Sequence, residues 1–277
     1  MALTPIQRII LRALAAERVN REERYVAGGV ALNTLLAAAR RSRDIDLFHD
    51  TDAALSASWA ADRKRLERDG FDIQVLREAP AFVEALVERD NDRTVIQWTR
   101  DSAFRFFPLI EDQTLGLTLH PFDLATNKVL AMAGRLEVRD WIDVLTCDAT
   151  LQPLGYLTWA ACGKDPGFNP RSLLAQARRL HYSREEVCAL DFAGDPPDAA
   201  EAGRRWHLAL EASVHIHDLM PAHEVGACVI TTDGDLFKET DPDRIAHALR
   251  DHRVAFHHGS IRGAWPRFMD PPSARPS

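Results

Sequence analysis

Residues 28–48, GGVALNTLLAAARRSRDIDLF, place the tightest constraint on the fold of this chain. The two leading glycines allow a sharp turn and a close approach of the main chain to a bulky group. Residues 30–39 are rich in Ala and Leu and contain no Pro or Gly, so they predict a helix of about three turns. Residues 43–48 alternate charged and apolar side chains, which predicts a strand. We therefore expect a glycine turn, a helix and an acidic strand in succession.

The acidic strand carries Asp44 and Asp46 on one face, because side chains two positions apart leave a strand on the same side. Two neighbouring carboxylates repel each other unless a cation lies between them. Mg2+ or Mn2+ would relieve this repulsion and prefers oxygen ligands. The main chain at Gly28 and Gly29 and the free N–H groups of the helix start would suit a phosphate. An Asp-x-Asp pair or a Gly-Gly turn alone is a weak signal, but their order and spacing predict nucleotidyl transfer from a nucleoside triphosphate (NTP).

The same segment resembles the polymerase β-type nucleotidyltransferase superfamily, and its sequence is similar to that of the AbiEii/AbiGii toxin group. The resemblance continues through DSAFRFFP at residues 101–108 and DLATNKVLAMAGRLEVRDWIDV at residues 123–144. It covers roughly residues 20–180. It implies the nucleotidyltransferase fold, with an active site between a sheet domain and a helical domain.

The resemblance also implies roles for residues outside the Asp-x-Asp pair. Lys128 matches the lysine of the family's DLATNK segment, a phosphate-site or catalytic residue, and Asp140 matches an acidic position. Arg139 would contact the nucleotide, or would form a buried Arg–Asp pair that ties two helices together. Ser42 and Arg43 resemble the segment before DID and would face phosphates, although exposed basic neighbours make a solvated role equally open.

The third catalytic carboxylate of polymerase β-like enzymes is missing from its expected strand at residues 94–98. Gln97 stands where relatives carry Asp, and Gln accepts no proton at neutral pH. Asp101 is the nearest substitute in sequence, and its alternative role is to cap a turn. We expect catalysis if Asp101 reaches the Asp-x-Asp pair, and a non-catalytic binding module if no carboxylate does.

The composition is typical of a globular protein, and the chain has no overall positive charge that would attract nucleic acid. The 277 residues carry a net charge of −7 and a pI of about 5.9, so a nucleic-acid partner would need a local basic patch. Four scattered cysteines form no Cys-x-x-Cys pair, which is typical of reduced intracellular thiols. The N-terminal residues show neither a signal peptide nor a membrane span. We expect a cytoplasmic protein with no membrane partner.

The expected fold class is α+β: a mixed nucleotidyltransferase sheet with helices, a helical domain, and a small β-rich C-terminal appendage. The expected domains are residues 1–120, 121–220 and 221–277. Predicted strands cover residues 24–27, 43–48, 71–76, 94–98 and 254–256, with hairpins through 115–119 and around the Asp-Gly turn at 233–234. Predicted helices cover residues 4–18, 30–39, 53–69, 81–88, 172–180, 184–190 and 197–214, and Gly134 either kinks or divides a helix that starts at Pro121.

The leading functional hypothesis is transfer of a nucleotide to an acceptor, with Mg2+ or Mn2+ as cofactor. The family resemblance implies a toxin or phage-defence role, an RNA such as tRNA or a protein as acceptor, and a cognate antitoxin as a further partner. Two alternatives stay open at this point. One is a catalytically impaired NTP- or RNA-binding module, and the other is an enzyme that modifies a small molecule.

Overall fold

The computed structural model describes residues 3–15 and 24–266 of the chain. Contacts divide the chain into two compact units. The sheet unit comprises Met1–Ala103, Leu109–Leu124 and Leu190–Pro196, and the helical unit comprises Phe104–Pro108, Ala125–Ala189 and Pro197–Ser277. The domain boundaries predicted at residues 120 and 220 stay a prediction.

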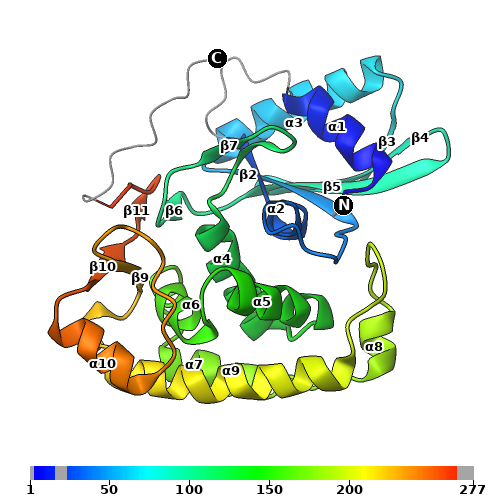
Figure 1. Cartoon of the computed structure of the whole chain (residues 1–277). Coiled ribbons are helices and arrows are strands. Elements are labelled where there is room, and N and C mark those ends of the chain that lie inside the picture. Colours follow the sequence, from blue (N-terminus) through cyan, green and yellow to red (C-terminus); the bar gives the residue numbers. More distant parts are fainter. Residues whose placement is uncertain (1–2, 16–23, 267–277) are drawn as a thin grey trace. The chain divides into compact units, whose positions relative to one another are not determined.

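A seven-stranded mixed sheet forms the centre of the sheet unit, in the order β3-β4-β5-β2-β1-β8-β7 (Figure 1). Its strands are β1 (Arg24–Ala27), β2 (Asp44–His49), β3 (Asp72–Ala79), β4 (Phe82–Arg89), β5 (Asp92–Arg100), β7 (Ile110–Asp112) and β8 (Gly116–Thr118). The β2–β5 and β1–β8 pairs are parallel, and the other pairs are antiparallel. The strand predicted at residues 43–48 and the hairpin predicted through residues 115–119 are confirmed within a few residues.

One face of the sheet is covered by α1 (Pro5–Ala15) and α3 (Asp52–Arg68). Trp98 of β5 packs against Trp59 of α3, with ring centroids 4.7 Å apart, and its indole N–H donates to the buried Asp62 carboxylate at 2.9 Å. The β2 residues that alternate with the aspartates are buried on this same side. The part of the predicted N-terminal helix at residues 16–18 lies outside the described residues.

The helix that follows the glycines, α2 (Gly28–Leu35), is shorter than predicted and starts earlier. It begins at the first glycine instead of Val30 and ends before Ala37, whose φ of 50° lies in the left-handed region that ends a helix. Figure 1 shows α2 on the other side of the sheet from α1 and α3. The helix predicted over residues 30–39 is therefore wrong in its bounds and right in its place along the chain.

The helix predicted over residues 81–88 is wrong, because these residues form the antiparallel strand β4. Their Ala, Glu and Leu content favours a helix, but Val83, Ala85 and Val87 are buried in alternation, which is the period of a strand. Pairing with β3 and β5 on both sides outweighs the local preference.

The helical unit contains the greater part of α4 (Pro121–Arg135), followed by α5 (Val138–Thr150), α6 (Leu154–Ala161), α7 (Pro170–Ala177), α8 (Arg184–Cys188) and α9 (Ala199–Leu219). Of the two alternatives for this region, a kinked helix or a divided one, the structure has two separate helices, α4 and α5. The break falls at Leu136, whose φ is 52°, and not at Gly134. Helix α6 follows Pro153 and was not predicted. In the described part of the chain, no helix is long and apolar enough to cross a membrane.

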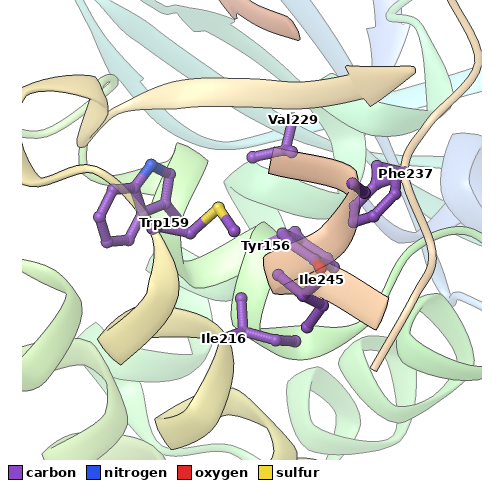
Figure 2. Close-up of a cluster of buried hydrophobic side chains, with 8 residues drawn as sticks. Tyr156, Trp159, Ile216, Val229, Phe237 and Ile245 are labelled. Atoms are coloured by element: carbon purple, nitrogen blue, oxygen red, sulfur yellow. The ribbon is translucent and has the colours of Figure 1, made fainter. Parts of the chain in front are cut away.

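The C-terminal elements of the helical unit are η2 (Ala222–Glu224), β9 (Ala227–Thr231), α10 (Pro242–Arg250), β10 (Val254–His258) and β11 (Ser260–Ile261), with β6 (Phe104–Arg105) paired to β11. The predicted hairpin around the Asp-Gly turn is reduced to one bridge between Ile230 and Leu236, and β9 pairs with β10 instead. Buried side chains from α6, α9, β9, α10 and the segments that follow α9 and β9 form a common hydrophobic cluster (Figure 2). Its members are Tyr156, Trp159, Ile216, Met220, Val229, Phe237, Ile245 and Ala248.

Candidate active site

The two aspartates of β2 lie on the face of the sheet opposite α1 and α3. Asp44 and Asp46 are half-buried, whereas Ile45 and Leu47 between and after them are fully buried. The alternation of the strand thus separates a packing face from an acidic face, as the sequence predicts. We call the side of β2, β5 and β4 that carries Asp44 and Asp46 the acidic face.

The first glycine of α2 lies directly against the second aspartate. A Cβ atom at Gly28 would sit 1.7 Å from Asp46 Oδ2, and the φ of Gly28 is +63°. No side chain other than hydrogen is compatible with this approach. The residue before it, Ala27, contributes no side-chain cap to the start of α2. The close approach of Gly28 places the start of α2 beside the Asp46 carboxylate.

The second glycine also has close neighbours, although less close than that of Gly28. A Cβ atom at Gly29 would lie 2.8 Å from both Ser42 Oγ and Arg40 Nη2. The structure thus brings together Gly28, Gly29, Ser42 and Asp46, which the sequence assigned to one site. Arg43 differs, because its side chain is exposed and its carbonyl oxygen accepts a hydrogen bond from Thr94 Oγ1 at 2.8 Å.

Asp101 does not join this group. Parallel pairing sets Asp46 opposite Gln97 and His49 opposite Arg100, and the Asp101 N–H donates to the His49 carbonyl at 2.9 Å. Asp101 therefore follows the last residue of β5, four positions after Gln97, or about 13 Å at the rise of a strand. Within residues 3–15 and 24–266, no three His, Cys, Asp or Glu side chains form a group that could hold a metal ion. The catalytic role of Asp101 stays a prediction.

Glu84 is an acidic-face residue that the sequence analysis missed. It lies on β4 directly opposite Gln97, and the Gln97 side-chain amide donates to Glu84 Oε1 at 2.8 Å. The alternation of Val83, Ala85 and Val87 was the available signal, because it places Glu84 on the other face from these buried residues.

Lys128 lies in the helical unit within a buried ion-pair cluster. Its Nζ is 3.0 Å from Asp140 Oδ1 and 3.3 Å from Asp143 Oδ2, and the Lys128 and Asp140 side chains are 9% and 0% exposed. Arg135 adds hydrogen bonds to both Asp140 oxygens, at 2.6 and 2.9 Å. Burial alone would raise the pKa of the Asp140 carboxyl, but Arg135 and Lys128 outweigh it and hold that pKa below its usual value.

Arg139 lies one residue before Asp140 on α5. It forms an ion pair with Glu137, with 2.6 Å between Nε and Oε2, and its side chain is partly exposed. Lys128 and Arg135 contribute cations to a buried basic–acidic cluster that joins α4 to α5. The role of Arg139 toward a nucleotide or toward a buried aspartate stays a prediction.

The donor chemistry of the acidic face fits a divalent metal ion. Mg2+ is commonly bound through one or two carboxylates together with the phosphates of a substrate, and needs no cage built wholly from protein. Asp44 and Asp46 supply two such oxygen donors on one face. The glycine at position 28 keeps the space beside the Asp46 carboxylate free of a side chain from α2.

Comparison with solved structures identifies the fold. A crystal structure from H. pylori, described provisionally as a nucleotidyltransferase, is 13% identical over 79% of this chain and 100% of its own, with a TM-score of 0.50. At this identity the likeness shows the fold alone, and the predicted mixed α+β fold of the nucleotidyltransferase type is confirmed.

Two further structures align with TM-scores below 0.5. JHP933 from Helicobacter pylori is 14% identical over 78% of this chain and 94% of its own, with a TM-score of 0.48. The nucleotidyltransferase toxin MenT4 from Mycobacterium tuberculosis H37Rv is 14% identical over 90% and 92%, with a TM-score of 0.47. No family model and no curated protein matches the sequence.

Proposed function

We propose that the chain is a metal-dependent nucleotidyltransferase that moves a nucleotide from an NTP to an acceptor. One observation carries the proposal: the start of α2 lies against Asp46, so a phosphate cradle and an Asp-x-Asp pair share one face of the sheet. The arrangement agrees with the nucleotidyltransferase-type fold.

Asp44 and Asp46 would hold Mg2+ or Mn2+ in this proposal. When bound, the ion would neutralise triphosphate charge and stabilise the charge that develops during transfer. Gly28 and Gly29 would present main-chain N–H groups of the α2 start to the phosphates, where the helix dipole favours negative charge. Ser42 lies beside Gly29 and would donate its hydroxyl to the same phosphates.

The acceptor hydroxyl needs a route for its proton, and Gln97 supplies none. Asp101 is the base considered from the sequence, although it lies further along the strand than the metal ligands. Lys128, Arg139 and Asp140 are assigned to the nucleotide by the family resemblance. For Lys128 we expect weaker NTP binding in Lys128→Ala, and only partial recovery in Lys128→Arg, because a guanidinium differs from an ammonium in shape and reach.

The acceptor and the biological role follow from the resemblance to the AbiEii/AbiGii group. We propose an RNA such as tRNA as acceptor, a toxin role, and a cognate antitoxin as partner. The segments at residues 101–108 and 123–144 support this assignment. A protein acceptor or a small-molecule acceptor would appear as a different labelled product in the experiment below.

The test is incubation of the purified full chain with each labelled NTP, Mg2+ and total RNA, with transfer read from the label in RNA, protein and small-molecule fractions. Asp44→Asn and Asp46→Asn should abolish transfer. Asp72→Asn, an exposed aspartate on the edge strand β3 of the same sheet, is the matched control and should leave transfer unchanged.

One observation favours a second candidate, an NTP- or RNA-binding module without catalysis. Gln97 occupies the position opposite Asp46, and no third acidic side chain groups with the pair in the described part of the chain. NTP binding that depends on Asp44 and Asp46, without transfer to any fraction, would establish this second function and contradict the first.

A further inference from the structure

We propose that the third oxygen ligand of the acidic face is the side-chain amide oxygen of Gln97, and that Glu84 is the residue that positions it. This inference rests on the proposed function, because it assigns a role toward the metal that Asp44 and Asp46 would hold. It gives the site two carboxylates and one neutral oxygen, and it explains why a glutamine can stand where a carboxylate is expected.

Three strands bring the relevant residues into one row. Asp46 of β2 lies directly opposite Gln97 of β5, and Gln97 lies directly opposite Glu84 of β4. Directly paired residues of neighbouring strands point to the same face of a sheet. Strands lie about 4.8 Å apart, so Gln97 is one strand from Asp46, and Glu84 is two strands away.

The hydrogen bond between Gln97 and Glu84 determines how the amide is turned. An ionised carboxylate only accepts hydrogen bonds, so the amide must present its NH2 group to Glu84, as the 2.8 Å distance from Nε2 to Oε1 shows. The amide oxygen then cannot face Glu84 as well. Within the described part of the chain, Gln97 Oε1 makes no hydrogen bond, whereas its Nε2 makes this one.

A carboxamide oxygen is a suitable ligand for a hard divalent ion, which binds neutral carbonyl and amide oxygens as well as carboxylates. Residues that orient a metal ligand through its other polar atom contribute strongly to metal affinity, even though they do not touch the ion. Glu84 occupies this position relative to Gln97. The sequence could not indicate the pair, since the two residues are thirteen positions apart and meet through the β4–β5 register.

The test is a titration of the full chain with Mn2+ alone, with free Mn2+ counted by electron paramagnetic resonance. Gln97→Met keeps the length of the side chain and removes both polar amide atoms. Glu84→Met removes the acceptor, and Glu84→Gln removes the charge but keeps an oxygen that can accept from Nε2. Glu88→Met, on the same strand and face but four residues away, is the matched control. Thermal melting of each variant reports whether it is folded.

We expect Glu84→Met to weaken Mn2+ binding about tenfold, as is typical when a residue that orients a metal ligand is removed. Gln97→Met should weaken it at least as much, Glu84→Gln less than Glu84→Met, and Glu88→Met not at all. In the Gln97→Met background, Glu84→Met should add nothing further, because Glu84 acts through the amide that is already gone.

Three results would overturn the inference while leaving the proposed function intact, provided that Mn2+ binding still depends on Asp44 and Asp46. The first is unchanged Mn2+ affinity in folded Gln97→Met. The second is an equal loss in Glu84→Gln and Glu84→Met, which would indicate an effect of charge alone. The third is a full loss from Glu84→Met in the Gln97→Met background, which would make Glu84 itself the ligand. If Mn2+ binding is absent or independent of Asp44 and Asp46, the inference and the proposed function both fail.

Discussion

The acidic face and the Lys128 cluster both entered the sequence analysis as parts of a nucleotide site, yet they hold their charges in different ways. On the acidic face, Asp44 and Asp46 bring charges of the same sign together on half-buried positions of one strand. In the Lys128 cluster, opposite charges from α4 and α5 pair with each other in a buried setting. The first arrangement places like charges side by side, and the second pairs opposite charges.

The contrast predicts how much each carboxylate contributes to the stability of the fold. A buried carboxylate that pairs with buried cations is part of the packing between two helices, so its removal leaves uncompensated charge in the interior. A half-buried carboxylate beside another carboxylate contributes little to stability and can even reduce it. The same Asp→Asn change should therefore cost much stability in the Lys128 cluster and little on the acidic face.

The largest effect is expected for Asp140→Asn, at about 3 kcal/mol of lost unfolding free energy. This is the lower end of the cost of removing one partner of a buried ion pair, because Lys128 keeps Asp143 as a partner. Denaturant unfolding with a constant m-value would measure it. Glu137→Gln is the control, since its ion pairs with Arg135 and Arg139 are partly exposed and should contribute less than about 1 kcal/mol.

If Asp140→Asn loses no more unfolding free energy than Glu137→Gln, the contrast between the two regions is wrong. The Lys128 cluster then contributes to ligand binding instead of to packing. A loss of NTP affinity in a fully stable Asp140→Asn protein would then support the role that the family resemblance assigns to Asp140.

The next effect concerns His49, which ends β2 on the buried face, opposite the acidic one. Burial lowers the pKa of His49 to about 4, with Asp62 opposing this shift and Arg24 adding to it. Because the folded pKa lies below the ordinary value of 6.5, stability is complete above pH 6.5 and falls as the pH drops toward 4. We expect a loss of about 2 kcal/mol between pH 7 and pH 5 from this group.

The measurement is the unfolding free energy of the wild type and of His49→Leu at both pH values. The difference between the two proteins isolates His49 from carboxylates that titrate in the same range. A wild-type pH slope that His49→Leu leaves unchanged would show that His49 is not kept neutral by the packing face.

A smaller effect is expected where the glycine start of α2 meets the acidic face. Gly28→Ala should lower the unfolding free energy by more than about 1 kcal/mol, because its φ is positive and the new Cβ would overlap Asp46 Oδ2. Gly134→Ala in α4 is the matched control: nothing lies within 4 Å of its new Cβ, and alanine in a helix should stabilise by about 0.5–1 kcal/mol. Calorimetry would measure the melting temperature of both variants. If Gly28→Ala is as stable as Gly134→Ala, the close contact between residue 28 and Asp46 does not exclude a side chain.

The acidic strand was predictable because its alternation is local: residues 44–47 alone separate two aspartates from Ile45 and Leu47. The fold class followed from that strand, the glycines and the resemblance. The pairing of Lys128 with Asp140 and Asp143 was not predictable, because it depends on how α4 and α5 cross after the break at Leu136.

The helix predicted over residues 81–88 had a further consequence for the site. Its helix-forming residues concealed a period of two, and a helix there removes β4 from the sheet. Without β4, Glu84 has no place beside Gln97, and Asp101 is then the acidic residue that the sequence suggests, because it is close to Gln97 along the chain. Short segments with pairing on both sides are where local preference is least informative.

The smallest change in stability is expected for Asp46→Asn, and it is the sharpest test of the contrast. The substitution keeps the size of the side chain and removes one of two like charges, so the unfolding free energy should stay within about 0.5 kcal/mol of the wild type. Mn2+ should raise the melting temperature of the wild type, because a ligand that binds only the folded state stabilises it by mass action. Asp46→Asn should lose this rise, while Asp140→Asn, although much less stable, should keep it. If Asp46→Asn instead unfolds as readily as Asp140→Asn, then Asp46 stabilises the start of α2 as a structural residue. The acidic face is in that case a packed surface, and the proposal that it binds a metal ion is wrong.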